Sequence, residues 1–308
     1  MRQESIVFMG TPEISKVYLQ SLIDHKYNII ATYTQPPRKQ GRGMLMQKSP
    51  AHALSLEHDI PVYHPENFTS LESINDLKKL KPDLVVIMGY GLLLPKSILQ
   101  IPPYGCINIH VSLLPKWRGA APIEHAILNG DEKTGVSIFL LEEKLDTGPI
   151  IATQKININK NINKENLTSE LNILGTTLLI NTLPDLLDKK ISLQKQDETY
   201  ATYAKKITPE LRRINFNNEI NAVYNQIRAF APNPSAWFTV NNMRFSIIKC
   251  LMKICEAEAS TIMNRQFHIG CKNGIIIPEI IQREGKKSMK IGEFLKGFAF
   301  DIGQKVNG

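Results

Sequence analysis

Short apolar runs alternate with helical patterns over the first half of the chain. A short apolar run at 5–9 and a stretch rich in β-branched residues at 28–34 predict two strands. Continuous apolar runs at 83–88 and 105–110 predict two more, with the pattern of strands buried on both faces. Between them, apolar residues recur at helical spacing and predict helices that begin near Ile14 and near Ser49 or Ser55, and that span 71–80 and 121–128. Because strands that alternate with helices pair in parallel through right-handed crossovers, the pattern predicts a doubly wound α/β sheet.

The last third of the chain has a different pattern. A helical stretch over 167–187 is followed by a polar segment, and beyond residues 220–230 come short β-like runs at 236–240, 245–250, 266–271 and 274–281. Turn signals separate these runs, for example Lys272-Asn273-Gly274. Several short strands close together predict a small β-barrel. We therefore expect a catalytic domain at 1–188, a linker at 189–207 and a barrel domain at 208–308.

Positive charge is concentrated in this later region. The 308-residue chain carries a net charge of +8, and residues 209–308 contribute +6 of it, with 14 Lys and Arg against 8 Asp and Glu. Nucleic acid is the commonest partner for such an asymmetry, although a basic solvated surface would have the same composition.

Several classes of protein are not expected. No apolar run approaches the roughly 18 residues of a spanning helix, and the chain starts directly with a strand-like segment, which predicts a cytoplasmic protein. The four cysteines form no C-x-x-C pair or zinc pattern, so we expect reduced thiols and no metal. The first strand is followed by Gly10-Thr11-Pro12 rather than G-x-G-x-x-G, which argues against a nicotinamide cofactor.

Two segments carry the candidate chemistry. Asn108 and His110 lie at the end of a predicted strand, where alternate side chains face the same side, and Asp146 heads a predicted turn. These groups suit acyl transfer to an amine. Asn108 and a protonated His110 could donate to a tetrahedral oxyanion, while Asp146 could orient His110 or accept protons through water. Each residue alone also has a structural interpretation, as a buried amide, a packed imidazole or a turn-forming carboxylate.

The motifs around these residues resemble the folate-dependent formyltransferase family. NIHVSLLPKWRGAAPI at 108–123 and LDTGP at 145–149 match its signature, and further matches follow in family order: FMGTP at 8–12, YTQP at 33–36, GRG at 41–43, GYGLLLP at 89–95, ITPE at 207–210, IRAFAPNPSAW at 227–237, QREGKK at 282–287 and FLKG at 294–297. The resemblance extends almost from end to end to the members that act on methionyl initiator tRNA.

The resemblance implies a Rossmann-like domain followed by an OB-like barrel, and formyl transfer from 10-formyltetrahydrofolate to the amino group of methionyl initiator tRNA in bacterial translation initiation. It places Asn108, His110 and Asp146 in the catalytic positions. It associates two stretches with the folate, Ser112, Leu113, Leu114 and Pro115 in one and Gly89, Tyr90, Gly91 and Leu92 in the other. Arg42 matches a basic residue that contacts the tRNA acceptor end.

Further basic residues are expected to contact the tRNA. The predicted loop 35–50 is long for a plain connection and also carries Arg38 and Lys39, which favours contact with phosphate. Lys286 and Lys287 could contact phosphate too, or form an ordinary solvated turn. We expect a monomer.

Other functions remain open at this point. The same catalytic residues could formylate a nucleotide sugar or glycinamide ribonucleotide, or hydrolyse 10-formyltetrahydrofolate. A catalytically silent RNA-binding protein could also retain the fold, although binding alone would not require Asn108, His110 and Asp146.

Overall fold

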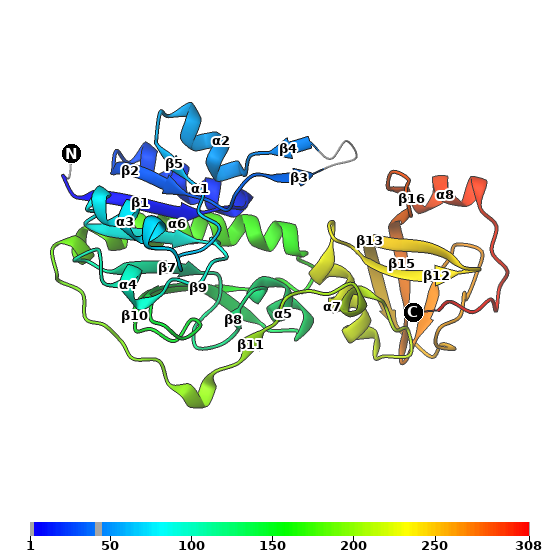
Figure 1. Cartoon of the computed structure of the whole chain (residues 1–308). Helices are drawn as coiled ribbons and strands as arrows, with labels where there is room; N and C mark the ends of the chain where they lie inside the picture. Colours follow the sequence, from blue (N-terminus) through cyan, green and yellow to red (C-terminus); the bar gives the residue numbers. More distant parts are fainter. Residues whose placement is uncertain (1–2, 41–44, 308) are drawn as a thin grey trace. The chain divides into compact units, whose positions relative to one another are not determined.

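A seven-stranded sheet organises the first part of the chain. The structure is a computed structural model that describes residues 3–40 and 45–307. The strand order of the sheet is β10-β9-β7-β6-β1-β2-β5. The sheet lies in the blue to green part of the ribbon in Figure 1. The strands are β1 (Ser5–Gly10), β2 (Asn28–Tyr33), β5 (Val62–Tyr63), β6 (Leu84–Met88), β7 (Cys106–His110), β9 (Lys133–Leu140) and β10 (Ile150–Asn157). Pairing is parallel from β7 through β6, β1 and β2 to β5, which confirms the predicted α/β class.

The β7–β9 pair departs from the expected parallel arrangement. β9 pairs antiparallel with β7, in a register that sets Ile107 opposite Leu140 and His110 opposite Ser137. The sequence pattern did not indicate β9 or β10. A run of buried apolar residues shows that a strand is enclosed but carries no information on its direction.

Helices cover this sheet, and local sequence explains where several begin. They are α1 (Glu13–Asp24), α2 (Pro50–Glu57), α3 (Leu71–Leu80), α4 (Lys96–Leu99) and α6 (Lys164–Leu187). Ser49 and Ser70 cap α2 and α3, since each hydroxyl accepts a hydrogen bond from a backbone N–H of the first turn. A Cβ on Gly175 of α6 would lie 1.9 Å from the Tyr18 hydroxyl of α1, so only glycine allows these two helices to approach so closely.

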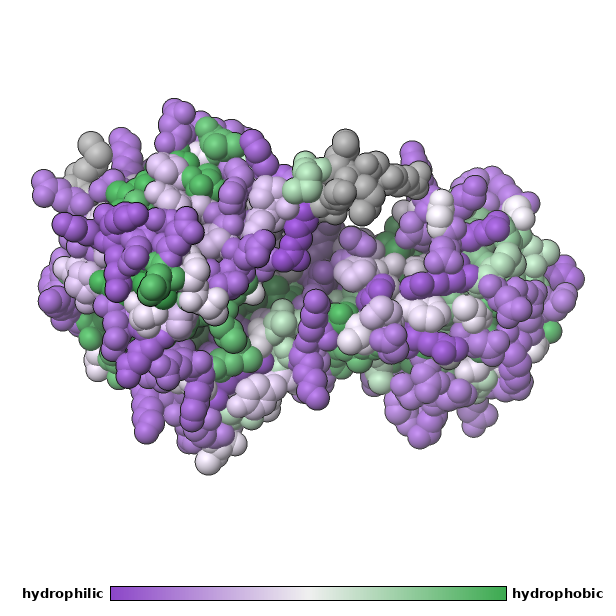
Figure 2. Space-filling view, in the orientation of Figure 1, coloured by the Kyte–Doolittle hydropathy of each residue, from purple (hydrophilic) through white to green (hydrophobic). Residues whose placement is uncertain are grey.

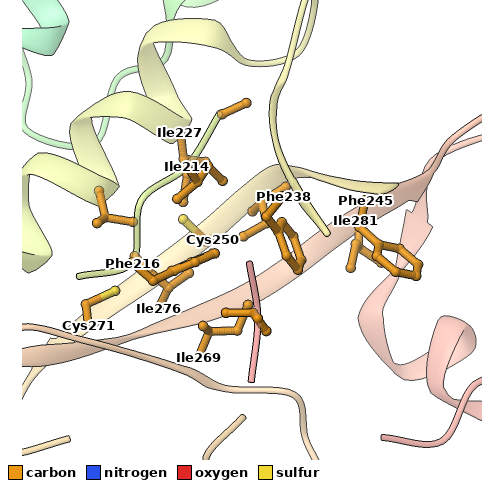
Figure 3. Packing of buried hydrophobic residues seen from close by; sticks show 14 of the residues in the cluster. Ile214, Phe216, Ile227, Phe238, Phe245, Cys250, Ile269, Cys271, Ile276 and Ile281 are labelled. Atoms are coloured by element: carbon orange, nitrogen blue, oxygen red, sulfur yellow. The ribbon is translucent and has the colours of Figure 1, made fainter. Parts of the chain in front are cut away.

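An antiparallel sheet forms the C-terminal part, where the short β-like runs predicted a small β-barrel. Its strands are β12 (Ala236–Val240), β13 (Met243–Ile254), β15 (Gly274–Arg283) and β14 (Ile269–Cys271), in that order, with β16 (Met289–Lys290) beside β15. Two helices accompany the sheet, α7 (Ile220–Phe230) and α8 (Ile291–Gly297). Figure 3 shows Ile227 of α7 and Ile214 over the sheet, and the rings of Phe238 and Phe245, whose centroids lie 5.9 Å apart, in its core.

The chain folds as two compact units. Residues 1–118, 135–156 and 170–203 form the first, and residues 119–134, 157–169 and 204–308 form the second, which therefore includes α5 (Pro122–Leu128). The expected linker at 189–207 is not featureless. It contains a 3-10 turn, η1 (Glu198–Tyr200), and the short strand β11 (Tyr203–Ala204), which pairs with β8 (Arg118–Gly119).

The expected loop at 35–50 contains regular structure as well. β3 (Arg38–Gln40) pairs antiparallel with β4 (Leu45–Gln47), so Arg38 lies opposite Gln47.

Hydrophilic side chains cover most of the visible surface of each unit (Figure 2). Among the residues that the structure describes, no helix is long and apolar enough to cross a membrane.

Candidate active site

Strand β7 brings Asn108 and His110 to one side of the sheet. Alternate residues of a strand point the same way, and the neighbours Ile107 and Ile109 are buried on the other side. In the backbone ladder, Asn108 lies between Ile87 of β6 and Phe139 of β9. Asn108 is half-buried while His110 is only 6% exposed, so the amide is the more accessible of the two polar side chains.

The loop between β9 and β10 carries Asp146 to this pair. The Asp146 carboxylate oxygen Oδ2 lies 3.8 Å from His110 Nδ1, and both side chains are buried. Asp146 has a φ of +52°, a conformation that aspartate tolerates better than most residues. Gly148 allows the loop to close, because a Cβ there would lie 1.7 Å from the Leu140 carbonyl oxygen.

The other nitrogen of His110 fixes the ring. His110 Nε2 lies 2.8 Å from the carbonyl oxygen of Trp117, and a carbonyl only accepts hydrogen bonds. Nε2 therefore carries a proton and donates it to Trp117. His110 Nδ1 faces the Asp146 carboxylate. A proton bound to Nδ1 would therefore lie beside a negative charge.

A buried arginine links this site to the expected linker. Arg118 is fully buried and donates from Nε and one terminal nitrogen to the Gln196 side-chain oxygen, at 3.2 and 2.8 Å. It also forms two hydrogen bonds with the Glu198 carboxylate, at 2.9 and 2.7 Å. Gln196 in turn donates to the carbonyl oxygens of Asp146 and Gly148, each at 2.8 Å. The sequence interpretation assigned no role to these polar residues.

The two stretches expected at the folate lie close to the ends of neighbouring strands. Ser112 is fully buried and its hydroxyl donates to the Lys116 carbonyl, while Leu114 is buried and its N–H donates to Ser137 Oγ. Leu113 and Pro115 are half-buried. One hydrogen bond within the loop and one to Ser137 of β9 therefore hold this stretch in place.

Gly89, Tyr90, Gly91 and Leu92 directly follow β6, which pairs in parallel with β7. Gly89 and Gly91 are exposed, whereas Tyr90 is buried and burial raises the pKa of its phenol. The Tyr90 carbonyl accepts hydrogen bonds from Thr11 and Gln35. The exposed backbone of the two glycines is the part of this loop that a ligand could approach.

The comparisons with known proteins assign this geometry to a family. The formyl transferase model matches residues 4–183, and the model of the formyl transferase C-terminal domain matches residues 206–299. A methionyl-tRNA formyltransferase of Wolbachia sp. (strain wRi) is 39% identical over 300 residues, covering 97% of this chain and 98% of its own length. The chain belongs to the methionyl-tRNA formyltransferase family. A second relative with that name, from Geotalea daltonii, is 37% identical over 304 residues and is covered to 97%.

Solved structures of more distant proteins share the fold of this methionyl-tRNA formyltransferase family member. An N-formyltransferase from Helicobacter canadensis, solved with folinic acid and dTDP-3-aminofucose, has a TM-score of 0.65 at 20% identity and is matched along 100% of its chain by 91% of this one. HypX from Aquifex aeolicus, solved with tetrahydrofolic acid, has a TM-score of 0.66 at 17% identity, with coverage of 96% of this chain and 48% of HypX.

The structure describes the residues that are expected to contact tRNA in different degrees of detail. Arg38 is exposed at the start of β3, and Lys286 and Lys287 are exposed after β15. The backbone of Lys39 lies in β3, opposite Met46. Arg42 lies outside the described residues. Within the described part of the chain, no cluster of His, Cys, Asp and Glu could hold a metal ion.

The Arg118–Glu198 pair should give this formyltransferase a pH-dependent stability. Hydrogen bonds from Arg118 hold the pKa of the Glu198 carboxyl below its ordinary value of about 4.3. Because the unfolded chain binds this proton more readily, the contribution is fully present above about pH 4.3 and is lost as the pH falls through the lower, folded-state pKa.

Melting temperatures of the wild type and Glu198→Gln test this expectation. The variant should melt at a lower temperature at pH 7, and the gap should close in acid, where Glu198 of the wild type is also neutral. A gap that is constant from pH 7 into the acid range would contradict the prediction.

Proposed function

We propose that this chain transfers the formyl group of 10-formyltetrahydrofolate to the amino group of methionyl initiator tRNA, with Asn108, His110 and Asp146 as its catalytic residues. The observation that carries the proposal is the buried His110–Asp146 pair beside Asn108, in a chain that matches methionyl-tRNA formyltransferases along almost their whole length. Proteins of this kind modify the charged tRNA that starts bacterial translation.

The chemistry follows from the position of each group. The methionine nitrogen attacks the formyl carbon, a C–N bond forms, and the carbonyl oxygen becomes an oxyanion. The accessible amide of Asn108 and a proton on His110 Nδ1, the ring nitrogen that does not bond to Trp117, stabilise that oxygen, which is the largest electrostatic demand of the step. The bond from the formyl carbon to the folate nitrogen then breaks, the attacking amine loses a proton, and the leaving folate nitrogen gains one.

Asp146 acts on the protons of this reaction. The carboxylate lies 3.8 Å from His110 Nδ1, where it stabilises positive charge on the ring. Through a water molecule, the same carboxylate can accept the proton that the attacking amine releases.

Folate binding is proposed for the two loops beside these residues. The exposed backbone at Gly89 and Gly91 and the stretch Ser112, Leu113, Leu114 and Pro115 flank the carboxyl ends of β6 and β7. Ligands of open α/β sheets bind outside the carboxyl ends of the strands, which supports this placement. Two of the solved relatives that share the fold were determined with a folate bound, which supports it further.

tRNA binding is proposed for the C-terminal domain, residues 208–308, and for the basic loop at 35–50. Residues 209–308 carry a net charge of +6. On this domain the Arg244 guanidinium lies 4.1 Å from the Trp237 ring centroid, beside a hollow of about 230 Å³ that Arg212 also lines. Arginine and tryptophan side by side offer a phosphate contact and a stacking surface, which suit RNA.

A single chain supplies all the proposed catalytic groups, so we propose that it works as a monomer. We place it in the bacterial cytoplasm, where charged initiator tRNA is available. The described residues contain no membrane-spanning helix.

Transfer of a labelled formyl group tests the proposal. Full-length protein is incubated with labelled 10-formyltetrahydrofolate in the presence of charged initiator tRNA, uncharged tRNA or no tRNA. We expect label on methionine only with the charged tRNA. Release of free formate without tRNA would indicate a hydrolase, and tRNA binding without turnover would indicate a silent RNA-binding protein.

The lysine pair after β15 allows a test of the tRNA surface. Replacing both Lys286 and Lys287 by alanine should weaken tRNA binding and reduce the salt slope of log Kd by about one unit for each lysine that contacts a phosphate. Turnover at saturating tRNA should change little.

The adjacent pair Lys78 and Lys79 on α3 is exposed in the same way and serves as a matched control. Alanine at these two positions should leave the salt slope unchanged. Equal slopes for all three proteins would remove Lys286 and Lys287 from the tRNA surface.

A further inference from the structure

We propose that Gln196 positions the Asp146–His110 pair, and that the segment from Gln196 to Thr202 is part of the active-site scaffold rather than a passive linker. The inference rests on the catalytic roles proposed above for Asp146 and His110. Gln196 is a positioning residue, because it contacts the backbone of the Asp146 loop and not a reacting atom.

Gln196 differs from its neighbours in its environment. It is 4% exposed, while residues 192–195 and 197–200 on both sides are exposed. Its side-chain nitrogen donates to two carbonyls of the same turn, those of Asp146 and Gly148. A buried amide that satisfies both of its donors on one turn restrains that turn, and here the turn carries the Asp146 carboxylate.

Arg118 determines which way the Gln196 amide points. Two guanidinium nitrogens donate to the Gln196 side-chain oxygen, and because arginine has no acceptor, the amide nitrogen cannot occupy that place. The nitrogen must therefore face the carbonyls of Asp146 and Gly148. Glu198 compensates the buried positive charge of Arg118 through two further hydrogen bonds.

The same segment also holds the partner of His110. Thr202 accepts from the Trp117 N–H through its hydroxyl at 2.9 Å, and from the Arg118 N–H through its carbonyl at 2.8 Å. These contacts stabilise Trp117 at a φ of +61°, an unusual conformation for a bulky residue. The Trp117 carbonyl is the acceptor of His110 Nε2, so one segment restrains both members of the pair.

The substitution Gln196→Glu distinguishes the role of the side-chain oxygen, which accepts hydrogen bonds, from that of the side-chain nitrogen, which donates them. A carboxylate still accepts from Arg118 but offers no donor to the carbonyls of Asp146 and Gly148, and it repels them. A misplacement of about 1 Å can reduce a rate by about 10²-fold, and we expect a loss of this size in kcat. The KM values for folate and tRNA should change little, because the buried Gln196 side chain bonds to Arg118 and to the backbone of the Asp146 loop.

The control and a second variant separate positioning from folding. Gln20→Glu on α1 makes the same amide-to-carboxylate change, at a side chain that donates to Asp24 one turn further along the same helix, and it should keep the wild-type rate. Gln196→Met, of similar length and without charge, should also lose kcat and serves if the glutamate variant does not fold. Circular dichroism and melting temperature establish that each variant is folded.

A double-mutant cycle supplies the decisive readout. If Gln196 acts through Asp146, then in an Asp146→Asn background the change Gln196→Glu should cost no more than about twofold in single-turnover rate. Losses that multiply, or a folded Gln196→Glu with wild-type kcat, would overturn the positioning role and leave the proposed function intact. A wild-type rate for Asp146→Asn alone would refute the proposed function as well.

Discussion

Asp146→Asn should reduce kcat by about 10³-fold, within the roughly 10²–10⁴-fold range of a lost proton-transfer or charge-stabilising group. Asparagine has the same shape and tolerates the left-handed φ of +52°, and the backbone carbonyl that Gln196 contacts remains. The charge beside His110 is therefore the change that matters. Because it is felt in the transition state, folate affinity should stay near the wild-type value.

Single-turnover formylation and equilibrium binding of a folate analogue measure the two quantities. Asp59→Asn is a matched control, because Asp59 also has a positive φ, of 54°, but is exposed. The control should behave like the wild type in both measurements. Near-normal turnover of Asp146→Asn would remove Asp146 from the catalytic residues.

Asn108→Ala should be almost as damaging, with a loss of about 10²–10³-fold in kcat, as is typical when one oxyanion donor is removed. The side chain lies in the middle of β7 and is half-buried, so its removal leaves no large cavity. The effect should again appear in kcat rather than in the KM for either substrate. Asn108→Asp keeps the shape but places a carboxylate where negative charge develops, and it should be at least as inactive.

Asn28→Ala on β2 provides the control, because Asn28 is an exposed strand asparagine of the same sheet. It should retain wild-type kinetics and a similar melting temperature. An Asn108→Ala protein with raised KM and unchanged kcat would indicate substrate binding rather than stabilisation of the oxyanion.

The strands that could be predicted from the sequence are those with a largely apolar run of residues. β1, β2, β6 and β7 stand out as apolar runs, and the helices at 71–80 and 121–128 begin and end close to the expected residues. β10 was missed because it is an edge strand with several exposed polar residues. In β9, Gly135 interrupts the pattern, although it is required because a Cβ would lie 2.2 Å from the Gln154 carbonyl oxygen.

The three candidate catalytic residues could be found from the sequence, and their surroundings could not. Alternation along β7 predicts that Asn108 and His110 face the same side, and the family motif draws attention to Asp146. Nothing local indicates that Gln196, in a polar segment, is buried against Arg118. Composition predicts exposure for both residues, and only the fold pairs a glutamine with an arginine 78 positions away.

Competition between acceptors in one reaction tests the central claim most directly. Full-length protein with labelled 10-formyltetrahydrofolate is offered methionyl initiator tRNA and a nucleotide-linked amino sugar together, since a sugar-modifying N-formyltransferase shares the fold. The proposed function predicts label on the methionine amino group alone, at a rate that Asp146→Asn abolishes almost completely. Label on the sugar, or release as free formate at the same rate with and without tRNA, would contradict it.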